Sequence, residues 1–152
     1  MTKPAVLLVG HGSKDMEGNV DFLKMADRAR ARFPGRLVKA CFIEYCDPEV
    51  PGGLDGLVAE GAKDITVVPV ILFAAGHVKM DITGSLDAAR KRHPGVAFRY
   101  GAHIGIQSGL FPVLEREARK VEAARGWDAD RTKTAVLLIG RGSSDPDANG
   151  DL

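Results

Sequence analysis

The chain has 152 residues, of which 45% are apolar and 27% are charged, and its formal net charge is +1. This balance predicts a globular protein with a buried core, and the scattered Lys and Arg residues argue against a nucleic-acid-binding protein. The apolar run Ala5–Val9 is too short for a signal peptide or a membrane span, so we expect a cytoplasmic protein without a membrane partner. In that compartment Cys41 and Cys46 are predicted to be free thiols.

Apolar runs and amphipathic stretches alternate along the chain. In chain order we expect a strand at Ala5–Val9, a helix from about Phe22 to Phe33, a strand at Leu37–Ile43, a helix from about Val50 to Gly61, a strand at Asp64–Leu72, a helix that follows the loop Ala74–His77 and ends near Arg92, a strand at Val96–Tyr100 and a helix from about Leu110 to Arg125. Such alternation predicts right-handed βαβ units, and therefore an α/β fold with a parallel four-stranded sheet flanked by helices.

The end of the chain repeats its beginning. Ala135–Ser143 matches Ala5–Ser13 at an offset of 130 (135 minus 5). At the same offset, three polar residues of the first copy recur in the second: Asp15, Asn19 and Asp21 as Asp145, Asn149 and Asp151. The repeat predicts duplication of a whole domain. We expect an α/β domain over 1–126, a linker over 127–133, and over 134–152 the start of a truncated second repeat that brings one extra strand.

Three polar side chains each follow a different predicted strand. They are His11, Glu44 and His77. Because the carboxyl ends of parallel strands meet at one edge, we expect them to converge there. Two imidazoles and a carboxylate suit Zn, Fe, Co or Ni, and an imidazole with a pKa near ~6.5 can also accept a proton. The alternatives are a helix-capping role for His11, a structural role for His77 and a solvated strand end for Glu44.

Other candidate residues are weaker. Cys46 could reach the same edge, but a thiolate would bind tightly a metal that has to be released, and we interpret it as a small apolar residue. Cys41 is predicted to lie in the core. His93, at a helix end, suits the helix dipole and is not expected in the site. His103, after the fourth strand, is a further candidate for lining the cleft.

Several familiar chemistries lack their motifs. The sequence contains no Gly-x-x-x-x-Gly-Lys-Ser/Thr run, so we expect no ATP bound through a phosphate loop. The turn at Gly10–Gly12 lacks the third glycine of a dinucleotide fingerprint, and no Gly-x-Ser-x-Gly elbow occurs. A histidine phosphotransfer enzyme with His11 as nucleophile is disfavoured, because the arginine that such enzymes carry before the histidine is replaced by Gly10.

Three segments together resemble the class II tetrapyrrole chelatases. They are Leu7–Ser13, Phe42-Ile43-Glu44 with Pro48 soon after, and Val68–Ile82. The resemblance covers residues 4–125 and is strongest to the sirohydrochlorin cobaltochelatases, with the sirohydrochlorin ferrochelatases next. The final segment resembles the start of the second domain in the long, two-domain form. The resemblance implies a lyase that inserts Co²⁺ into sirohydrochlorin in cobalamin biosynthesis; the alternatives are iron insertion for sirohaem and a non-catalytic metal or tetrapyrrole carrier.

The resemblance also implies roles for particular residues. His11 and His77 would bind the incoming metal and assist loss of the pyrrole protons, with Glu44 as a supporting metal ligand. Cations expected at the rim of the cleft, facing the substrate carboxylates, are Lys14, Lys79 and Arg141. No cofactor is implied beyond the substrate metal, which is Co²⁺, Fe²⁺ or Ni²⁺. Because the cleft of the family lies between two halves, a homodimer or a second chelatase half is expected to complete it.

Overall fold

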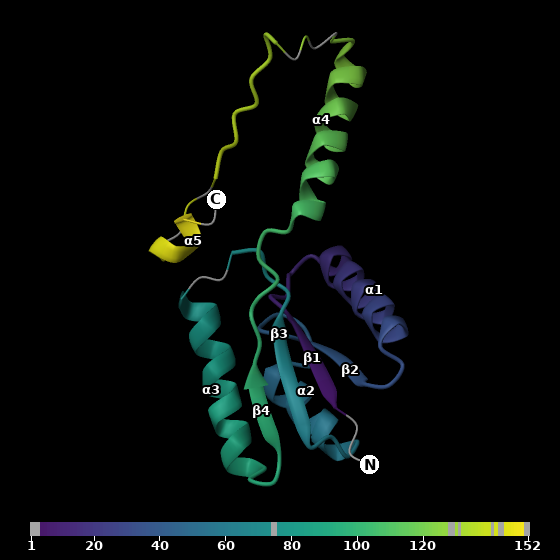
Figure 1. The fold of residues 1–152 in the computed structure, drawn as a ribbon. Helices are drawn as coiled ribbons and strands as arrows, with labels where there is room; N and C mark the ends of the chain where they lie inside the picture. Colours follow the sequence, from purple (N-terminus) through teal and green to yellow (C-terminus); the bar gives the residue numbers. More distant parts are fainter. Residues whose placement is uncertain are drawn as a thin grey trace. The chain divides into compact units, whose positions relative to one another are not determined.

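The computed structural model describes residues 4–73, 76–127, 130, 132–140, 142 and 145–150 (Figure 1). The chain forms two compact units, Met1–Gly105 and Ile106–Leu152. The predicted domain boundaries at residues 126 and 133 stay a prediction.

The first unit is a parallel α/β sheet. Its elements in chain order are β1 (Ala5–Gly10), α1 (Met16–Arg32), β2 (Leu37–Phe42), α2 (Val50–Ala59), β3 (Asp64–Pro69), α3 (Gly76–Arg92) and β4 (Ala97–Tyr100). The strands lie in the order β2-β1-β3-β4, and every neighbouring pair is parallel. The arrowheads in Figure 1 accordingly point the same way. The predicted four-stranded parallel sheet flanked by helices is confirmed.

Helices cover both faces of this sheet because the side chains of each strand alternate between them. Leu7 and Val9 of β1 belong to a core that also contains residues of α2 and α3, such as Leu54 and Ile82. Leu8 points the other way and packs with Ala26 of α1 and with Val38. Burying one such leucine stabilises the fold by about 1.5–3 kcal/mol. The sheet is therefore held rigidly between α1 on one face and α2 and α3 on the other.

Three element boundaries differ from the prediction for local reasons. The first helix starts at Met16, six residues before Phe22, because Asp15 caps it by accepting a hydrogen bond of 3.0 Å from the backbone N–H of Glu17. The third strand ends at Pro69, three residues before Leu72, although the N–H of Val70 still donates to the carbonyl of Val9 at 2.8 Å. The third helix already includes residues 76 and 77, which were expected in the loop.

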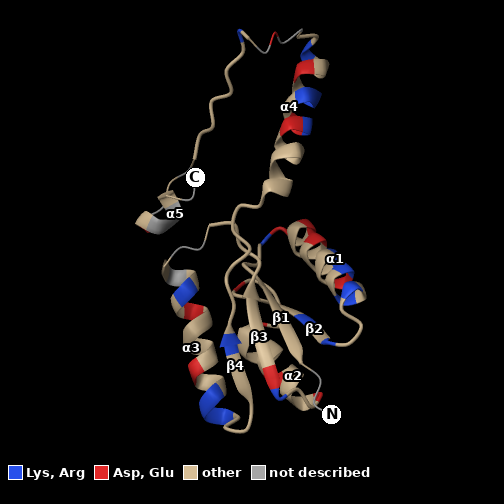
Figure 2. Ribbon diagram, viewed as in Figure 1, with Lys and Arg blue, Asp and Glu red and all other residues tan. Residues whose placement is uncertain are grey.

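The outer faces of the helices are charged. Figure 2 shows Lys, Arg, Asp and Glu concentrated on the helices, while the strands are mostly without charge. On α1 and on α4 (Phe111–Arg125) many of these residues form pairs one turn apart, among them Lys24–Asp21 and Arg119–Glu115. In the part of the chain that the structure describes, no helix is both long and apolar enough for a membrane span.

The second unit contains a short 3₁₀ helix η1 (Ser108–Leu110), the long helix α4 (Phe111–Arg125) and a short helix α5 (Pro146–Gly150). The extra strand predicted within 134–152 is wrong: Ala135–Ile139, which nearly copies the sequence of β1, has no regular secondary structure. Val136 and Ile139 are 82% and 83% exposed. A strand exists only through hydrogen bonds to a neighbour, and none of the described residues pairs with this segment.

The internal repeat is also visible in the backbone. Gly12 has φ +90° and the equivalent Gly142 has φ +78°. Helices begin at Met16 and at Pro146, again 130 residues apart (146 minus 16). Two described features of the turn after β1, the left-handed glycine and the helix start that follows it, therefore recur 130 residues later.

Asp55 of α2 ties this helix to the end of α3. Its carboxylate accepts hydrogen bonds from His93 Nε2 at 2.8 Å and from Arg92 Nη2 at 3.0 Å. The bond from His93 first, and then that from Arg92, lowers the pKa of Asp55 below its ordinary value. A carboxyl group with a lowered pKa stabilises the fold above its unfolded-state pKa and loses that contribution as the pH falls through the folded-state pKa.

We therefore expect Asp55→Ala to lower the free energy of unfolding at pH 7 by about 0.5–1 kcal/mol, a modest value because the carboxylate is half exposed to solvent. The difference from wild type should shrink as the pH falls below 3.8, the ordinary pKa of this group. Urea unfolding followed by circular dichroism, at pH 7 and at low pH, measures the difference in free energy of unfolding between the two proteins. An equal difference at both pH values would contradict the stabilising role of the ionised Asp55 carboxylate.

Candidate active site

The turn after β1 is built against the loop after β2. The backbone N–H of Glu44 donates to the carbonyl of His11 at 3.1 Å. Gly12 has a left-handed backbone, and a Cβ at this position would lie 1.8 Å from the carbonyl oxygen of Glu44. Only glycine permits this approach. The close contact brings residues 11 and 44 together, although 33 positions (44 minus 11) separate them.

A buried asparagine holds the rest of the turn. Asn19 is 3% exposed, its Oδ1 accepts from the N–H of Ser13 at 2.9 Å and its Nδ2 donates to the carbonyl of Ser13 at 2.8 Å. Both polar groups of the amide are thus satisfied, and the loop is fixed to α1. Sequence reasoning gave Asn19 no role in the site. The recurrence of an asparagine at position 149 was the signal that could have identified it.

His11 and Glu44 form the centre of the site. His11 Nδ1 lies 3.5 Å from Glu44 Oε1, and the two side chains are 46% and 44% exposed. The same Nδ1 lies 3.3 Å from the carbonyl oxygen of Gly12. Since a carbonyl oxygen only accepts, that contact is a hydrogen bond in the tautomer with the proton on Nδ1. In this tautomer Nε2 keeps a lone pair that can bind a metal or take up a proton.

A small pocket adjoins the imidazole. Its volume is about 210 Å³, and it is lined by Gly10, His11, Gly12, Ser13, Gly18, Asn19, Phe22, Phe42 and Val70. Phe22 and Phe42 meet edge to face in this pocket, with ring centroids 5.2 Å apart. The volume is below the range of about 300–1,000 Å³ typical for small-molecule sites. The pocket therefore suits a small group, and a larger ligand would have to lie across the edge of the sheet.

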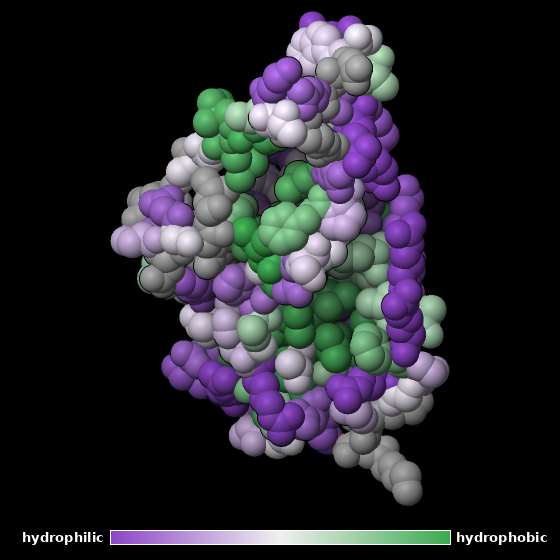
Figure 3. Space-filling view, turned by 45° about the horizontal axis from the view of Figure 1, so that its top comes forward, coloured by the Kyte–Doolittle hydropathy of each residue, from purple (hydrophilic) through white to green (hydrophobic). Residues whose placement is uncertain are grey.

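Large apolar side chains are exposed at this end of the first unit. Met16 at the start of α1 is 63% exposed, and Met80 near the start of α3 is 69% exposed. Tyr45 after β2 and Leu72 after β3 are 54% and 42% exposed. Figure 3 shows hydrophobic surface open to solvent between hydrophilic residues on the face turned forward. Exposed apolar groups around an imidazole and a carboxylate favour a ligand with apolar surface.

Two of the predicted site residues cannot be compared with the structure in full. The backbone of His77 lies in the first turn of α3, but its side chain is outside the described part of the structure. Arg141 is outside the described residues. Among the side chains that are described, no group of three or more His, Cys, Asp or Glu residues could hold a metal ion. The metal set of His11, Glu44 and His77 therefore stays a prediction.

The other rim candidates lie close to the same edge. Lys14 Nζ lies 5.4 Å from the ring centroid of Tyr45, the residue after Glu44. Burial raises the pKa of the Tyr100 hydroxyl at the end of β4, and the positive charge of Lys79 on α3 opposes that shift. The structure thus places Lys14 beside the loop that carries Glu44. Sequence reasoning did not predict the contact between Lys14 and Tyr45.

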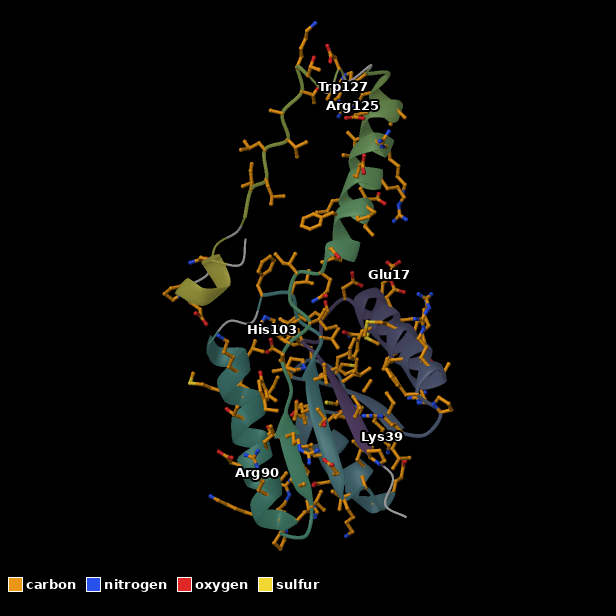
Figure 4. All side chains as sticks on the ribbon, in the orientation of Figure 1. Glu17, Lys39, Arg90, His103, Arg125 and Trp127 are labelled. Atoms are coloured by element: carbon orange, nitrogen blue, oxygen red, sulfur yellow. The ribbon has the colours of Figure 1, made fainter. Side chains whose placement is uncertain are left out.

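His103 is carried to the same edge. The N–H of Ile104 donates to the carbonyl of Pro69 at 3.0 Å, and that of Gly105 to the carbonyl of Ile71 at 3.1 Å, so the chain after β4 continues beside the end of β3. Figure 4 shows the labelled His103 at the end of the sheet to which the strands point, and Arg90 toward the other end. The position of His103 agrees with a role in lining the cleft, and that role stays a prediction.

Both cysteines are free thiols, as predicted. Cys41 is fully buried in the core, and burial raises the pKa of its thiol to about 12. It is therefore unreactive at neutral pH. The Cys46 thiol contacts the carbonyl oxygen of Asp47 at 3.7 Å. Neither sulfur belongs to a metal-binding group among the described side chains.

A parallel α/β domain that presents a histidine and a carboxylate at the carboxyl edge of its sheet has the architecture expected of a class II chelatase. The profile of the CbiX family matches residues 5–121. The chain is 40% identical over 148 residues to sirohydrochlorin cobaltochelatase of Priestia megaterium, a match that covers 97% of this chain and 47% of that protein. The chain belongs to the CbiX family, and the resemblance to class II chelatases is confirmed.

Two further relatives support this placement. Sirohydrochlorin ferrochelatase of Priestia megaterium is 31% identical over 148 residues, which are 97% of this chain and 54% of that protein. The crystal structure of the sirohydrochlorin chelatase SirB from Bacillus subtilis subspecies spizizenii in complex with cobalt superposes with a TM-score of 0.81 at 30% identity, over 99% of this chain and 58% of that one. The chain thus spans about half the length of these relatives.

Proposed function

We propose that this chain contributes to the insertion of a divalent metal into sirohydrochlorin, and that the metal is Co²⁺. The observation that carries the proposal is the pairing of His11 with Glu44 at 3.5 Å on the carboxyl edge of the sheet, in a chain of the CbiX family. Cobalt is favoured over iron because the identity is 40% to the Priestia megaterium cobaltochelatase and 31% to the ferrochelatase.

The proposed chemistry follows from charge. A tetrapyrrole loses two N–H protons as a divalent ion enters its centre, so a base beside a weakly held metal serves both steps. His11 supplies Nε2 for the metal or for a proton, while the carboxylate beside its Nδ1 stabilises the imidazole when it becomes positively charged. His77 is proposed as the second imidazole. No further cofactor and no ATP take part in this proposal.

We assign substrate binding to residues at the rim of the proposed cleft. Sirohydrochlorin carries eight carboxylates, and the cations proposed to meet them are Lys14, Lys79 and Arg141. The exposed apolar side chains around the site would contact the flat face of the ring. The pocket of about 210 Å³ beside His11 is too small for the macrocycle and leaves room for an ion with its water.

A single half of this kind leaves one face of a macrocycle uncovered. We propose that a second chelatase half, for example that of a second copy of this chain, completes the cleft. The internal repeat at 135–149, which restarts the sequence of the first half, supports a two-half architecture. A cytoplasmic location is part of the same proposal.

The test is an anaerobic absorbance assay of sirohydrochlorin with Co²⁺, and separately with Fe²⁺, in the presence and absence of the chain. We expect faster conversion to the metallated spectrum with the chain, and a larger acceleration for Co²⁺. A larger acceleration for Fe²⁺ would favour the ferrochelatase alternative. Tight binding of sirohydrochlorin in a titration, without any acceleration, would favour a non-catalytic carrier.

A further inference from the structure

Tyr45 has an unusual backbone for an aromatic residue. Its φ is +65°, and it is the one non-glycine residue with a positive φ among those described. Left-handed backbone is unfavourable for a residue with a Cβ, and such strain is often found at functional sites. The ring is 54% exposed, so burial in the core does not account for this conformation.

The position of Tyr45 links it to the site. It directly follows Glu44, whose backbone N–H is bonded to the carbonyl of His11. The ring meets Lys14, which comes from the other loop, three residues after His11, and lies with Nζ 5.4 Å from the ring centroid. This cation–π contact restrains an otherwise exposed ring. Two loops that each carry a site residue thus jointly present an aromatic face beside an ammonium group.

The geometry points to Tyr45 as a stacking platform for the planar substrate, with the Lys14 ammonium placed to meet a carboxylate at the ring's periphery. This inference rests on the proposed function and adds a residue that determines how the macrocycle is held over His11. An exposed aromatic ring offers a flat, polarisable surface to a conjugated ring, and offset stacking is favourable for such pairs. A carboxylate beside the ammonium would be attracted to it.

The test compares variants that keep the left-handed backbone but differ in the ring. Tyr45→Asn removes the ring, and asparagine tolerates a positive φ. Tyr45→Gly is a second ring-free variant should the first fold poorly, and Tyr45→Phe keeps the ring without the hydroxyl. The matched control is Phe33→Asn, since Phe33 is 52% exposed and follows the end of α1, away from the site.

We expect both ring-free variants to weaken sirohydrochlorin binding, and to raise KM, by about tenfold, an estimate from the strength of aromatic pairs. The value of kcat should stay within about twofold, because interactions that bind substrate and transition state equally change KM rather than kcat. Tyr45→Phe and Phe33→Asn should bind as wild type does. A ring-free, folded variant with unchanged binding would overturn the inference.

The same measurements separate this inference from the proposed function. If the wild-type chain binds sirohydrochlorin without inserting metal, the proposed catalytic function fails, and the binding comparison still decides the role of Tyr45. If the wild-type chain does not bind sirohydrochlorin, both proposals are overturned.

Discussion

His11→Ala is expected to slow metal insertion by at least about 100-fold, the size of effect typical for loss of a positioned acid or base. The imidazole is the group that our proposal uses to hold the metal and to take up a pyrrole proton, and alanine can do neither. Because the side chain is 46% exposed, its removal should leave the fold intact. The measurement is the rate of metallated sirohydrochlorin formation, with circular dichroism to check folding.

His77→Ala is expected to abolish metal insertion in the same assay, since the proposal assigns the second imidazole to this residue. His93→Ala is the matched control. It also removes a histidine, but one that bonds to Asp55 between α2 and α3. We expect the control to lose some stability and to keep its rate at 25 °C. Normal turnover by a well-folded His77→Ala chain would remove His77 from the proposed site.

The layers of the fold were predictable because hydrophobic patterning reflects burial. The runs around Leu7 and Val67 are apolar on consecutive positions, as strands covered on both faces must be, and both residues are fully buried. Helix starts were harder to predict. The first helix begins at Met16 because of a single capping bond from Asp15, while its apolar pattern becomes clear only near Phe22.

The approach of His11 to Glu44 was predictable from topology, since parallel strands deliver the residues that follow them to one edge. The clamp by Asn19 and the contact between Lys14 and Tyr45 were not. Both depend on the path of a loop backbone, through a buried amide in one case and a left-handed residue in the other. Residue type and spacing do not specify such a path, and the repeat of the asparagine at position 149 was the one sequence signal that pointed to Asn19.

The extra strand at Ala135–Ile139 shows where local pattern is insufficient. Its sequence nearly copies β1, which lies between β2 and β3 in the sheet and forms hydrogen bonds with both. The copy has no strand beside it among the described residues, and its side chains are exposed. Whether a segment forms a β-strand depends on the strands beside it as much as on its own residues.

Gly12→Ala should destabilise the first unit by roughly 2–4 kcal/mol, because it combines an unfavourable left-handed alanine with loss of a backbone hydrogen bond. The new Cβ would meet the carbonyl oxygen of Glu44 at 1.8 Å, which is inside the contact distance of any two non-bonded atoms. The loop after β2 has to move away, and the bond from Glu44 N–H to His11 breaks with it. Thermal unfolding should show a melting temperature lower by roughly 10–20 °C.

Alanine substitutions at two other glycines distinguish the effect of the clash with Glu44 from the effect of the left-handed backbone. Gly18 lies in α1 with a negative φ and open space around it, so Gly18→Ala should be neutral or slightly stabilising. Gly142 has φ +78°, and no atom of the described residues lies within 4 Å of a Cβ built on it, so Gly142→Ala tests the left-handed conformation without that clash. If Gly12→Ala costs no more than Gly142→Ala, the contact with Glu44 does not constrain the turn. A much larger loss at Gly12, accompanied by loss of metal insertion, would show that this contact positions His11 beside Glu44.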